Sequence, residues 1–333
     1  MEVNLSKLNR YFLFFAVLLI SLFSYGQKDS INHTKSQIQF VCDNNFFLFS
    51  DKDGYYTSGI FLRYDQALKN REIDRKSTVS VELGQMIFTA HDRKILPQPT
   101  SQYPGGISEI DRPIAGYTYG KIIKNVFTNH QHLYTYGLSL GVVGEYSLGR
   151  ITQEYWHELI GVKDHWNWVW DYQINNEFGA NLHGAFSKSL IKASRNPLIQ
   201  LTPSATLTLG THFTDITHAA VLQIGRFKSI GESNFWNTIN TITSNHTVKE
   251  FFIYYKPELK YQLYNSTIQG GLFTNDKGPI TGSPEPLVFK QTVGMYLSLN
   301  RTCMAYEVTF QSKEVVDQFN NHIYAGIIAK YRF

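Results

Sequence analysis

The sequence lacks the features that mark several classes of protein. Its 333 residues include only two cysteines, Cys42 and Cys303, which excludes a disulfide framework. One bridge between the two cysteines is the alternative, but they lie in strand-like segments at opposite ends of the chain, and we expect free thiols. A net charge of +4 is too small to indicate nucleic-acid binding. Beyond the N-terminal segment there is no run of about 18 apolar residues, so the sequence predicts no transmembrane helix.

The N-terminal segment has the layout of a secretory signal peptide. Lys7 and Arg10 precede the apolar run YFLFFAVLLISLF, and the small residues Ser24 and Gly26 follow it. This run is short for a membrane-spanning helix, and no cysteine follows it directly, which argues against a lipoprotein anchor. We predict that residues 1–26 are removed by cleavage after Gly26. An uncleaved N-terminal anchor is the alternative.

Aromatic residues are abundant, at 15% of the chain, and Tyr and Phe dominate them. In an exported protein with few charges this favours a membrane β-barrel with aromatic girdles over a secreted β-sandwich or a soluble barrel. Long segments of alternating polarity also favour it. In RTCMAYEVTFQ, one face carries Met304, Tyr306, Val308 and Phe310. The last strand ends in the aromatic Phe333, which resembles the sorting signal of bacterial outer-membrane proteins.

The sequence therefore predicts an all-β fold: one transmembrane antiparallel β-barrel over residues 27–333, with a short helix in an extracellular loop. Single-chain membrane barrels have even strand numbers. We expect about twelve strands, with ten and fourteen as the neighbouring counts. The expected strands are 38–49, 56–66, 77–90, 115–127, 132–146, 169–190, 197–211, 215–227, 250–264, 266–273, 287–299 together with 302–312, and 322–333.

The segment YSLGRITQEYWHELIGVKDHWNW breaks the period of two and predicts a short helix over residues 150–161. Gln153 and His157 are four residues apart, so they share one helix face. Ile151, Tyr155 and Leu159 fall on another stripe. Taken alone, His157 is better explained as a solvated or hydrogen-bonded histidine than as a functional one.

The stretch DNNFFLFSDKDGYYTSGIFLRYD concentrates oxygen donors. Asp43, Asn44 and Asn45, with Thr57 and the backbone carbonyls near Gly59, provide the oxygen-only ligands that suit a hard cation such as Ca²⁺. The stretch is not an EF-hand, because DKDGYYTSGIFL lacks the required glycine and glutamate. Residues 51–54 instead predict a tight turn that pairs the two flanking strands.

A loop rich in proline and glycine follows the third expected strand. Its basic residues Arg93 and Lys94 form a cluster suited to phosphate by charge and hydrogen bonding. From this segment alone, a solvated loop is the better interpretation.

Taken together and in order, these segments resemble one family, the LpxR-type lipid A 3′-O-deacylases of Gram-negative outer membranes. The resemblance covers roughly residues 40–180, and residues 190–333 match only as barrel. The matching segments are DNNFF, DKDGYYTSGIFLRY, GQMIFTAHD, DRPIAGYTYG, LGVVGEYSLGRITQEYWHELIG and WDYQINNE.

The resemblance implies a twelve-stranded barrel whose active site lies between the barrel wall and a helix from an extracellular loop. It also implies a Ca²⁺-dependent esterase that removes the 3′-linked acyloxyacyl group of lipid A. His157 matches the family's catalytic histidine, and Gln153 matches the glutamine one helical turn before it. Asn44 matches the asparagine near the metal, while Thr57 and Gly59 match the Tyr-Thr-x-Gly motif.

The chain departs from the family pattern in the charge of two positions. The family's aspartate after the asparagine is Asn45 here. The amide keeps an oxygen but loses a negative charge, so we expect weaker Ca²⁺ binding unless Asp43 compensates. Where the family can have an acidic residue after the helix, this chain has Lys163, followed by Asp164. The family's substrate-contacting lysine has no clean match, and Arg93 or Lys94 is nearest.

The resulting hypothesis is ester hydrolysis with His157 as general base and Gln153 as its positioner. Ca²⁺ would stabilise the oxyanion as a Lewis acid, with Asn44, Asn45, Thr57 and Gly59 as its expected ligands. The expected partners are lipopolysaccharide and outer-membrane lipid, with no nucleic acid, and we expect a monomer. Two alternatives stay open: a porin or structural barrel without catalysis, and an outer-membrane phospholipase.

Overall fold

The computed structural model describes residues 34–48, 54–69, 75–90, 110–129, 131–160, 167–190, 198–239 and 249–333. Several predictions from the sequence lie outside these residues: the cleavage site after Gly26, the basic pair Arg93 and Lys94, and the departures at Lys163 and Asp164.

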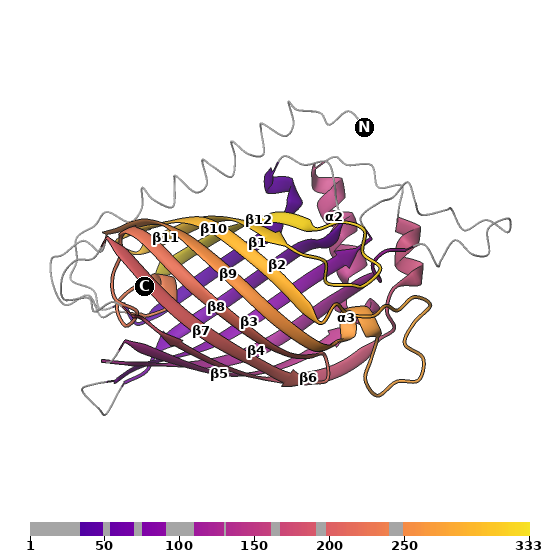
Figure 1. The fold of residues 1–333 in the computed structure, drawn as a ribbon, viewed down its shortest axis with the longest axis horizontal. Coiled ribbons are helices and arrows are strands. Elements are labelled where there is room, and N and C mark those ends of the chain that lie inside the picture. The colour runs from indigo at the N-terminus through magenta and orange to yellow at the C-terminus, as the bar shows by residue number, and fades with distance from the viewer. Residues whose placement is uncertain are drawn as a thin grey trace.

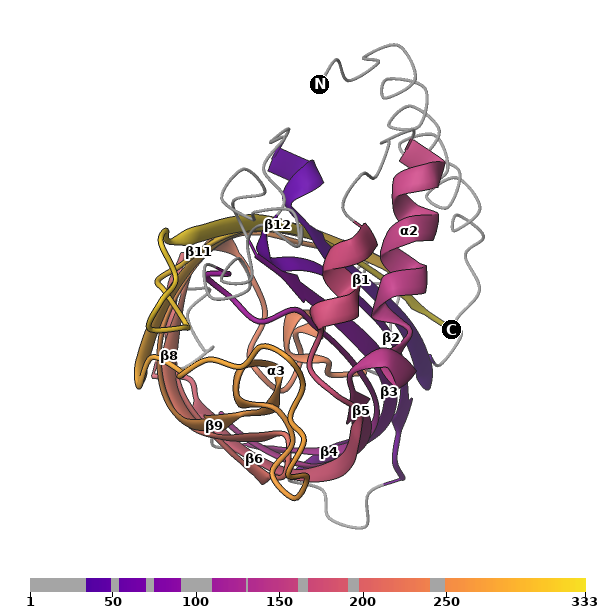
Figure 2. The same ribbon diagram turned by 90° about the vertical axis from the view of Figure 1, so that its right-hand side faces the viewer.

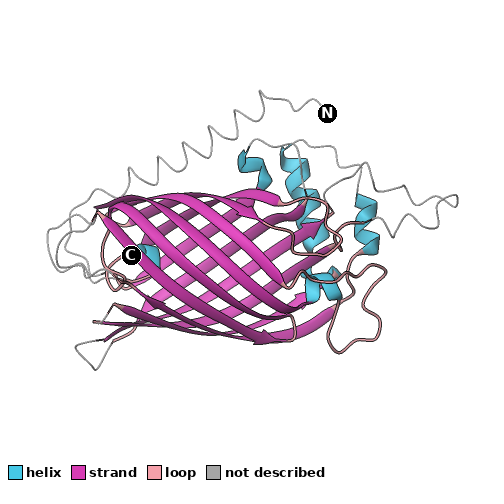
Figure 3. Cartoon of the chain, in the orientation of Figure 1, coloured by secondary structure: helices cyan, strands magenta, loops and turns pink. Residues whose placement is uncertain are grey.

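Twelve antiparallel strands form a closed barrel, and each strand pairs with its neighbours along the chain (Figures 1 and 3). The first strand pairs with the last, with Phe40 opposite Ala329, which closes the barrel. No helix of the described residues is long and apolar enough to cross a membrane. The strands are β1 (Ser36–Asn44), β2 (Tyr55–Ala67), β3 (Arg75–Thr89), β4 (Ala115–Thr128), β5 (His132–Val143), β6 (Glu177–Lys188), β7 (Ile199–Gly210), β8 (Phe213–Arg226), β9 (Lys249–Asn265), β10 (Leu287–Leu299), β11 (Thr302–Gln311) and β12 (His322–Arg332).

The predicted number of strands is confirmed, but two of the expected segments contain a different number of strands from the one predicted. Residues 266–273 begin with a short helix, α3 (Ser266–Gln269), because the Asn265 side chain accepts a hydrogen bond from the Thr267 N–H and caps it. Residues 287–312 form two strands rather than one, since Asn300 adopts a left-handed conformation with φ 51° and turns the chain back. These two errors cancel in the count.

The strand wall is apolar outside and polar inside, the reverse of a soluble barrel. Leu62 and Tyr64 on β2 are exposed, whereas Arg63 and Asp65 between them are buried. Inside the barrel, Arg63 donates to Asp65 over 2.6 Å. On β11, the predicted alternation is confirmed: Cys303, Ala305 and Thr309 are buried, and Tyr306 and Phe310 are exposed. This is the pattern of a barrel whose outer face contacts lipid.

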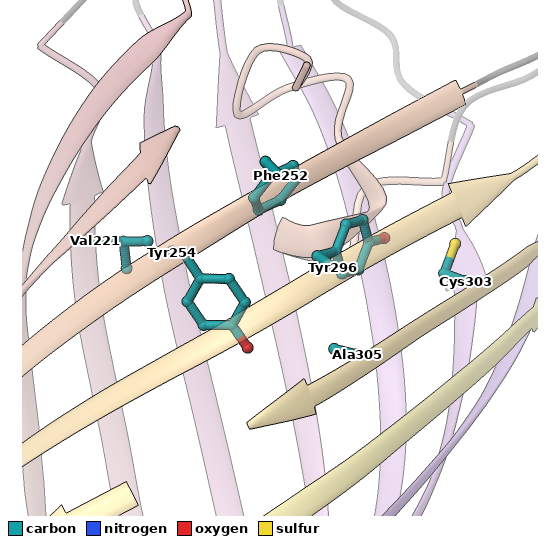
Figure 4. Close-up of a cluster of buried hydrophobic side chains, with 6 residues drawn as sticks. All are labelled: Val221, Phe252, Tyr254, Tyr296, Cys303 and Ala305. Carbon is teal, nitrogen blue, oxygen red and sulfur yellow. The ribbon is translucent and has the colours of Figure 1, made fainter. Parts of the chain in front are cut away.

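One end of the barrel is filled by the segment around η6 (Asn234–Trp236). The Phe235 ring lies 4.9 Å from the Tyr254 ring and 5.4 Å from the Phe252 and Tyr296 rings. These three aromatics point into the barrel beside Cys303 (Figure 4). Both cysteines are free and buried, as predicted.

At the opposite mouth, α3 and the loop that follows it cross the barrel opening (Figure 2). Arg112, which precedes β4, anchors this region from within. Its guanidinium donates to Glu314 over 2.6 Å and to Thr267 over 3.1 Å. The pair lies outside the strands and is fully enclosed.

The Arg112–Glu314 pair predicts a specific loss of stability in acid. Burial alone would raise the pKa of Glu314, but the adjacent Arg112 lowers it to about 2, from 4.5. A carboxyl with a lowered pKa stabilises the folded state above its unfolded-state pKa, and this contribution disappears as the pH falls from about 4.5 to about 2. Glu314→Gln should therefore lower the thermal unfolding midpoint at pH 7 and reduce the free energy of unfolding by about 3–5 kcal/mol.

The measurement is thermal unfolding of the refolded barrel in detergent at pH 7 and at pH 2.5. The wild type should lose more stability over this interval than Glu314→Gln does. Exposed Glu158→Gln serves as the control. Equal acid sensitivity of wild type and Glu314→Gln would contradict the assignment.

Candidate active site between the wall and helix α2

Helix α2 (Gly149–Ile160) lies outside the barrel, against β3 and β4 (Figure 2). It confirms the helix predicted over residues 150–161. Its start is tied to the wall through the carbonyl of Ser147, which ends η3 (Glu145–Ser147). That carbonyl accepts from Gln85 Nε2 on β3 over 2.6 Å and from Thr118 Oγ1 on β4 over 2.7 Å.

Two glycines let the helix approach the wall closely. A Cβ on Gly116 would lie 2.0 Å from Ser147 Oγ, and a Cβ on Gly149 would lie 3.0 Å from the Cα of Gly116. Neither glycine position leaves room for a side chain. The start of α2 therefore rests almost directly on the backbone of β4.

The two polar residues predicted to share a face do so, and this face is buried. Gln153 and His157 are each only 6% exposed. Gln153 Oε1 accepts a hydrogen bond from Trp170 Nε1 over 2.9 Å. Trp170 lies in η4 (Asn167–Tyr172) and is itself buried. A glutamine side chain held in this way has a fixed orientation one helical turn from the imidazole.

Trp170 was missed from the sequence. The segment containing it was interpreted as the start of a strand over residues 169–190, but the structure forms η4 there and β6 begins at Glu177. Trp170 packs with Ile87, Ala90 and Ile114. The indole is therefore both a hydrogen-bond donor to the helix and part of the apolar contact that joins helix to wall.

The predicted cation ligands lie at the ends of β1 and β2. Asn44 ends β1, and its Oδ1 accepts from the Phe46 N–H over 2.7 Å as the chain enters η1 (Asn45–Leu48). Thr57 lies at a register shift in β2, and its Oγ1 is 2.7 Å from Thr89 Oγ1 on β3. Asn44, Asn45 and Thr57 are all buried.

The end of β3 connects these ligands to the helix. Thr89 contacts Thr57, while Ile87 and Ala90 on either side of Thr89 pack against Trp170, which holds Gln153. Sequence reasoning gave no role to Thr89, which stands in the segment GQMIFTAHD. The structure thus brings the two predicted residue sets to the same end of the same strand.

Asp43 lies on the other face of the wall, so it does not compensate for the missing charge at Asn45. Successive strand residues point to opposite faces. Asp43 accepts from the Tyr56 hydroxyl over 2.9 Å, and Tyr56 lines the interior cavity of about 280 Å³. Gly59 permits this contact, because a Cβ there would lie 1.9 Å from that hydroxyl. Its carbonyl as a cation ligand stays a prediction.

The other predicted ligands have the chemistry that a hard cation prefers. Asn44, Asn45 and Thr57 offer oxygen atoms only, which Ca²⁺ prefers. Among the described residues, no three His, Cys, Asp or Glu side chains lie close enough together to hold a metal ion. The set therefore suits Ca²⁺ by its oxygen ligands and lacks the carboxylate that would make binding tight.

Comparisons with known proteins agree with this architecture. The family model described as "Outer membrane protein LpxR" matches residues 12–333. The structure of LpxR from Salmonella typhimurium superimposes with a TM-score of 0.70 at 18% identity, covering 89% of this chain and 100% of that one. The β domain of the Bordetella autotransporter BrkA gives a TM-score of 0.46 at 8% identity, covering 91% and 99%. No curated protein sequence matched the chain.

Proposed function

The chain belongs to the LpxR family of outer membrane proteins, and from this membership we propose that it is an esterase that deacylates lipid A. The proposed reaction removes the 3′-linked acyloxyacyl group in the outer leaflet. The observation that carries it is the buried pair of Gln153 and His157, held between α2 and the outer wall. A lipid in the membrane can reach a site on the outside of a barrel.

In this proposal, His157 accepts a proton from the attacking water, because imidazole titrates near neutral pH and can act as a base there. Gln153 acts through His157. Its Oε1 is occupied by Trp170 Nε1, so its two amide N–H groups point elsewhere and can position the imidazole. The apolar outer wall would receive the acyl chains, and Arg93 and Lys94 are proposed to meet the phosphates.

We further propose that Asn44, Asn45, Thr57 and the Gly59 carbonyl hold Ca²⁺. When bound, such an ion supplies Lewis-acid stabilisation to an oxyanion. The burial of the three side chains and their oxygen donors support this assignment.

The charge of the donor set gives a test. Asn45→Asp should lower the Ca²⁺ concentration needed for half-maximal activity on the order of tenfold, since Ca²⁺ affinity rises with the charge of its ligands. The matched control is Asp43→Asn. Asp43 lies two residues before Asn45 and faces the interior, so this change should leave the required Ca²⁺ concentration unchanged. Activity that persists unaltered in excess chelator would refute the role of Ca²⁺.

The alternatives are a porin and a phospholipase. The segment around η6 fills one end of the barrel, and α3 with its loop crosses the other, which argues against a wide channel. The decisive experiment expresses the chain in a Gram-negative host and compares extracted lipid A and phospholipid by mass spectrometry. Loss of an acyloxyacyl group from lipid A supports the proposal. Lysophospholipid with intact lipid A would instead indicate a phospholipase.

A further inference from the structure

Helix α2 turns three of its apolar residues away from the barrel. An ordinary surface helix does the opposite, with its apolar stripe against the core. Ile151 and Tyr155 are 61% and 68% exposed, and Leu159 is also exposed. The spacing of four residues places these three side chains in one row. With exposed Leu148 just before the helix, they form what we call the apolar stripe.

A row of charged residues runs beside the apolar stripe. The Nε of Arg150 lies 2.9 Å from Oε1 of Glu154, and its Nη1 lies 2.9 Å from Oδ1 of Asp171. Glu158 continues the row four residues after Glu154. Glu158 is exposed. The helix therefore has a buried polar row against the wall, a charged row and the apolar stripe, and half-buried Trp156 lies on the remaining side.

The apolar stripe is continuous with the lipid-facing wall. The ring of exposed Tyr146, which precedes the helix, lies 6.1 Å from the ring of Phe178. Phe178 is 70% exposed on the outer face of β6, and Leu182 and Leu140 extend the same exposed surface along β6 and β5. Exposed Tyr146, two residues before Leu148, thus brings the start of the apolar stripe next to the apolar surface of the wall.

Water is a poor solvent for such a surface. Burying a side chain of the size of Leu or Ile stabilises by roughly 1.5–3 kcal/mol relative to leaving it exposed. Apolar patches of this extent mark interaction or membrane surfaces. An amphipathic helix whose apolar and charged rows lie side by side is the type that rests in the plane of a membrane interface.

We infer that α2 is an interfacial helix of the outer leaflet: its apolar stripe lies among lipid acyl chains, and its charged row lies at the level of the head groups. The occupant of the stripe is lipid, because the stripe joins the wall that lipid already covers. This inference rests on the membrane location of the barrel and not on the deacylase proposal.

Site-directed spin labelling measures this directly. Single labels at Ile151→Cys and Leu159→Cys report on the stripe, Glu158→Cys reports on the charged row, and Leu140→Cys on β5 is the lipid-facing reference. The protein is reconstituted into vesicles of palmitoyl-oleoyl-phosphatidylcholine. The native thiols are buried, so unmutated protein should take up no label, and heat-modifiable migration in gels shows that each variant has folded.

The two stripe labels should collide with oxygen several-fold more than with a water-soluble nickel chelate, as the label at residue 140 does. The label at residue 158 should show the reverse preference. Equal access of the chelate to residues 151 and 158 would place the helix in water and overturn the inference. Low collision with both reagents at residues 151 and 159 would indicate a protein partner on the stripe, and would overturn it as well.

Discussion

His157→Gln should reduce release of the acyloxyacyl group to background, a loss of about 10²–10⁴-fold, which is the range that a general base contributes. Glutamine has a similar volume and can still form hydrogen bonds in the buried space that the imidazole fills. It has no group that titrates near neutral pH. The hydrogen bond between Trp170 and Gln153 should persist, so the loss reports on proton transfer rather than on the position of α2.

The matched control is His218→Gln, because His218 is exposed on β8, away from α2. This variant should deacylate like the wild type. Both variants are compared by mass spectrometry of lipid A after equal folded protein has been confirmed by heat-modifiable migration. Activity of His157→Gln within about fivefold of the wild type would exclude the general-base role.

The fold could be predicted because a membrane barrel displays its pattern in every strand. Val308 and Phe310 face lipid and Thr309 faces the interior, so the alternation is visible in the letters themselves. The errors arose where one side chain changes the path of the backbone. Asn265 caps a helix in a segment that reads as strand, and Asn300 reverses the chain within a continuous alternating run.

The candidate site was less accessible from the sequence. Asn44, Thr57, Gln153 and His157 came from short motifs, and only the fold could show that the end of β3 joins them. Trp170 opens the matching segment WDYQINNE, but its role could not be assigned there, because an indole donor is recognised by its acceptor and not by its neighbours in sequence. The expectation that Asp43 could compensate for Asn45 is wrong, because Asp43 and Asn44 are successive strand residues and point to opposite faces of the wall.

Gly116→Val should remove most of the activity while leaving the barrel folded. At Gly116, even a Cβ would meet Ser147 Oγ at 2.0 Å and the Gly149 Cα at 3.1 Å. Ser147 is buried and its Oγ donates to the Gly144 carbonyl, so it cannot move aside without losing that bond. The start of α2 must therefore shift from the wall. A displacement near 1 Å at a catalytic group can cost on the order of 10²-fold in rate.

The control is Gly120→Val, four residues along the same face of β4. A Cβ there meets only Leu83 Cδ2, at an ordinary 3.7 Å, and valine suits a half-buried strand position. Both variants should show wild-type heat-modifiable migration, since neither change touches the strand pairing. Activity should fall with Gly116→Val alone. If both variants keep full activity, the close contact between α2 and β4 is not what positions His157, and the site between wall and helix loses its structural basis.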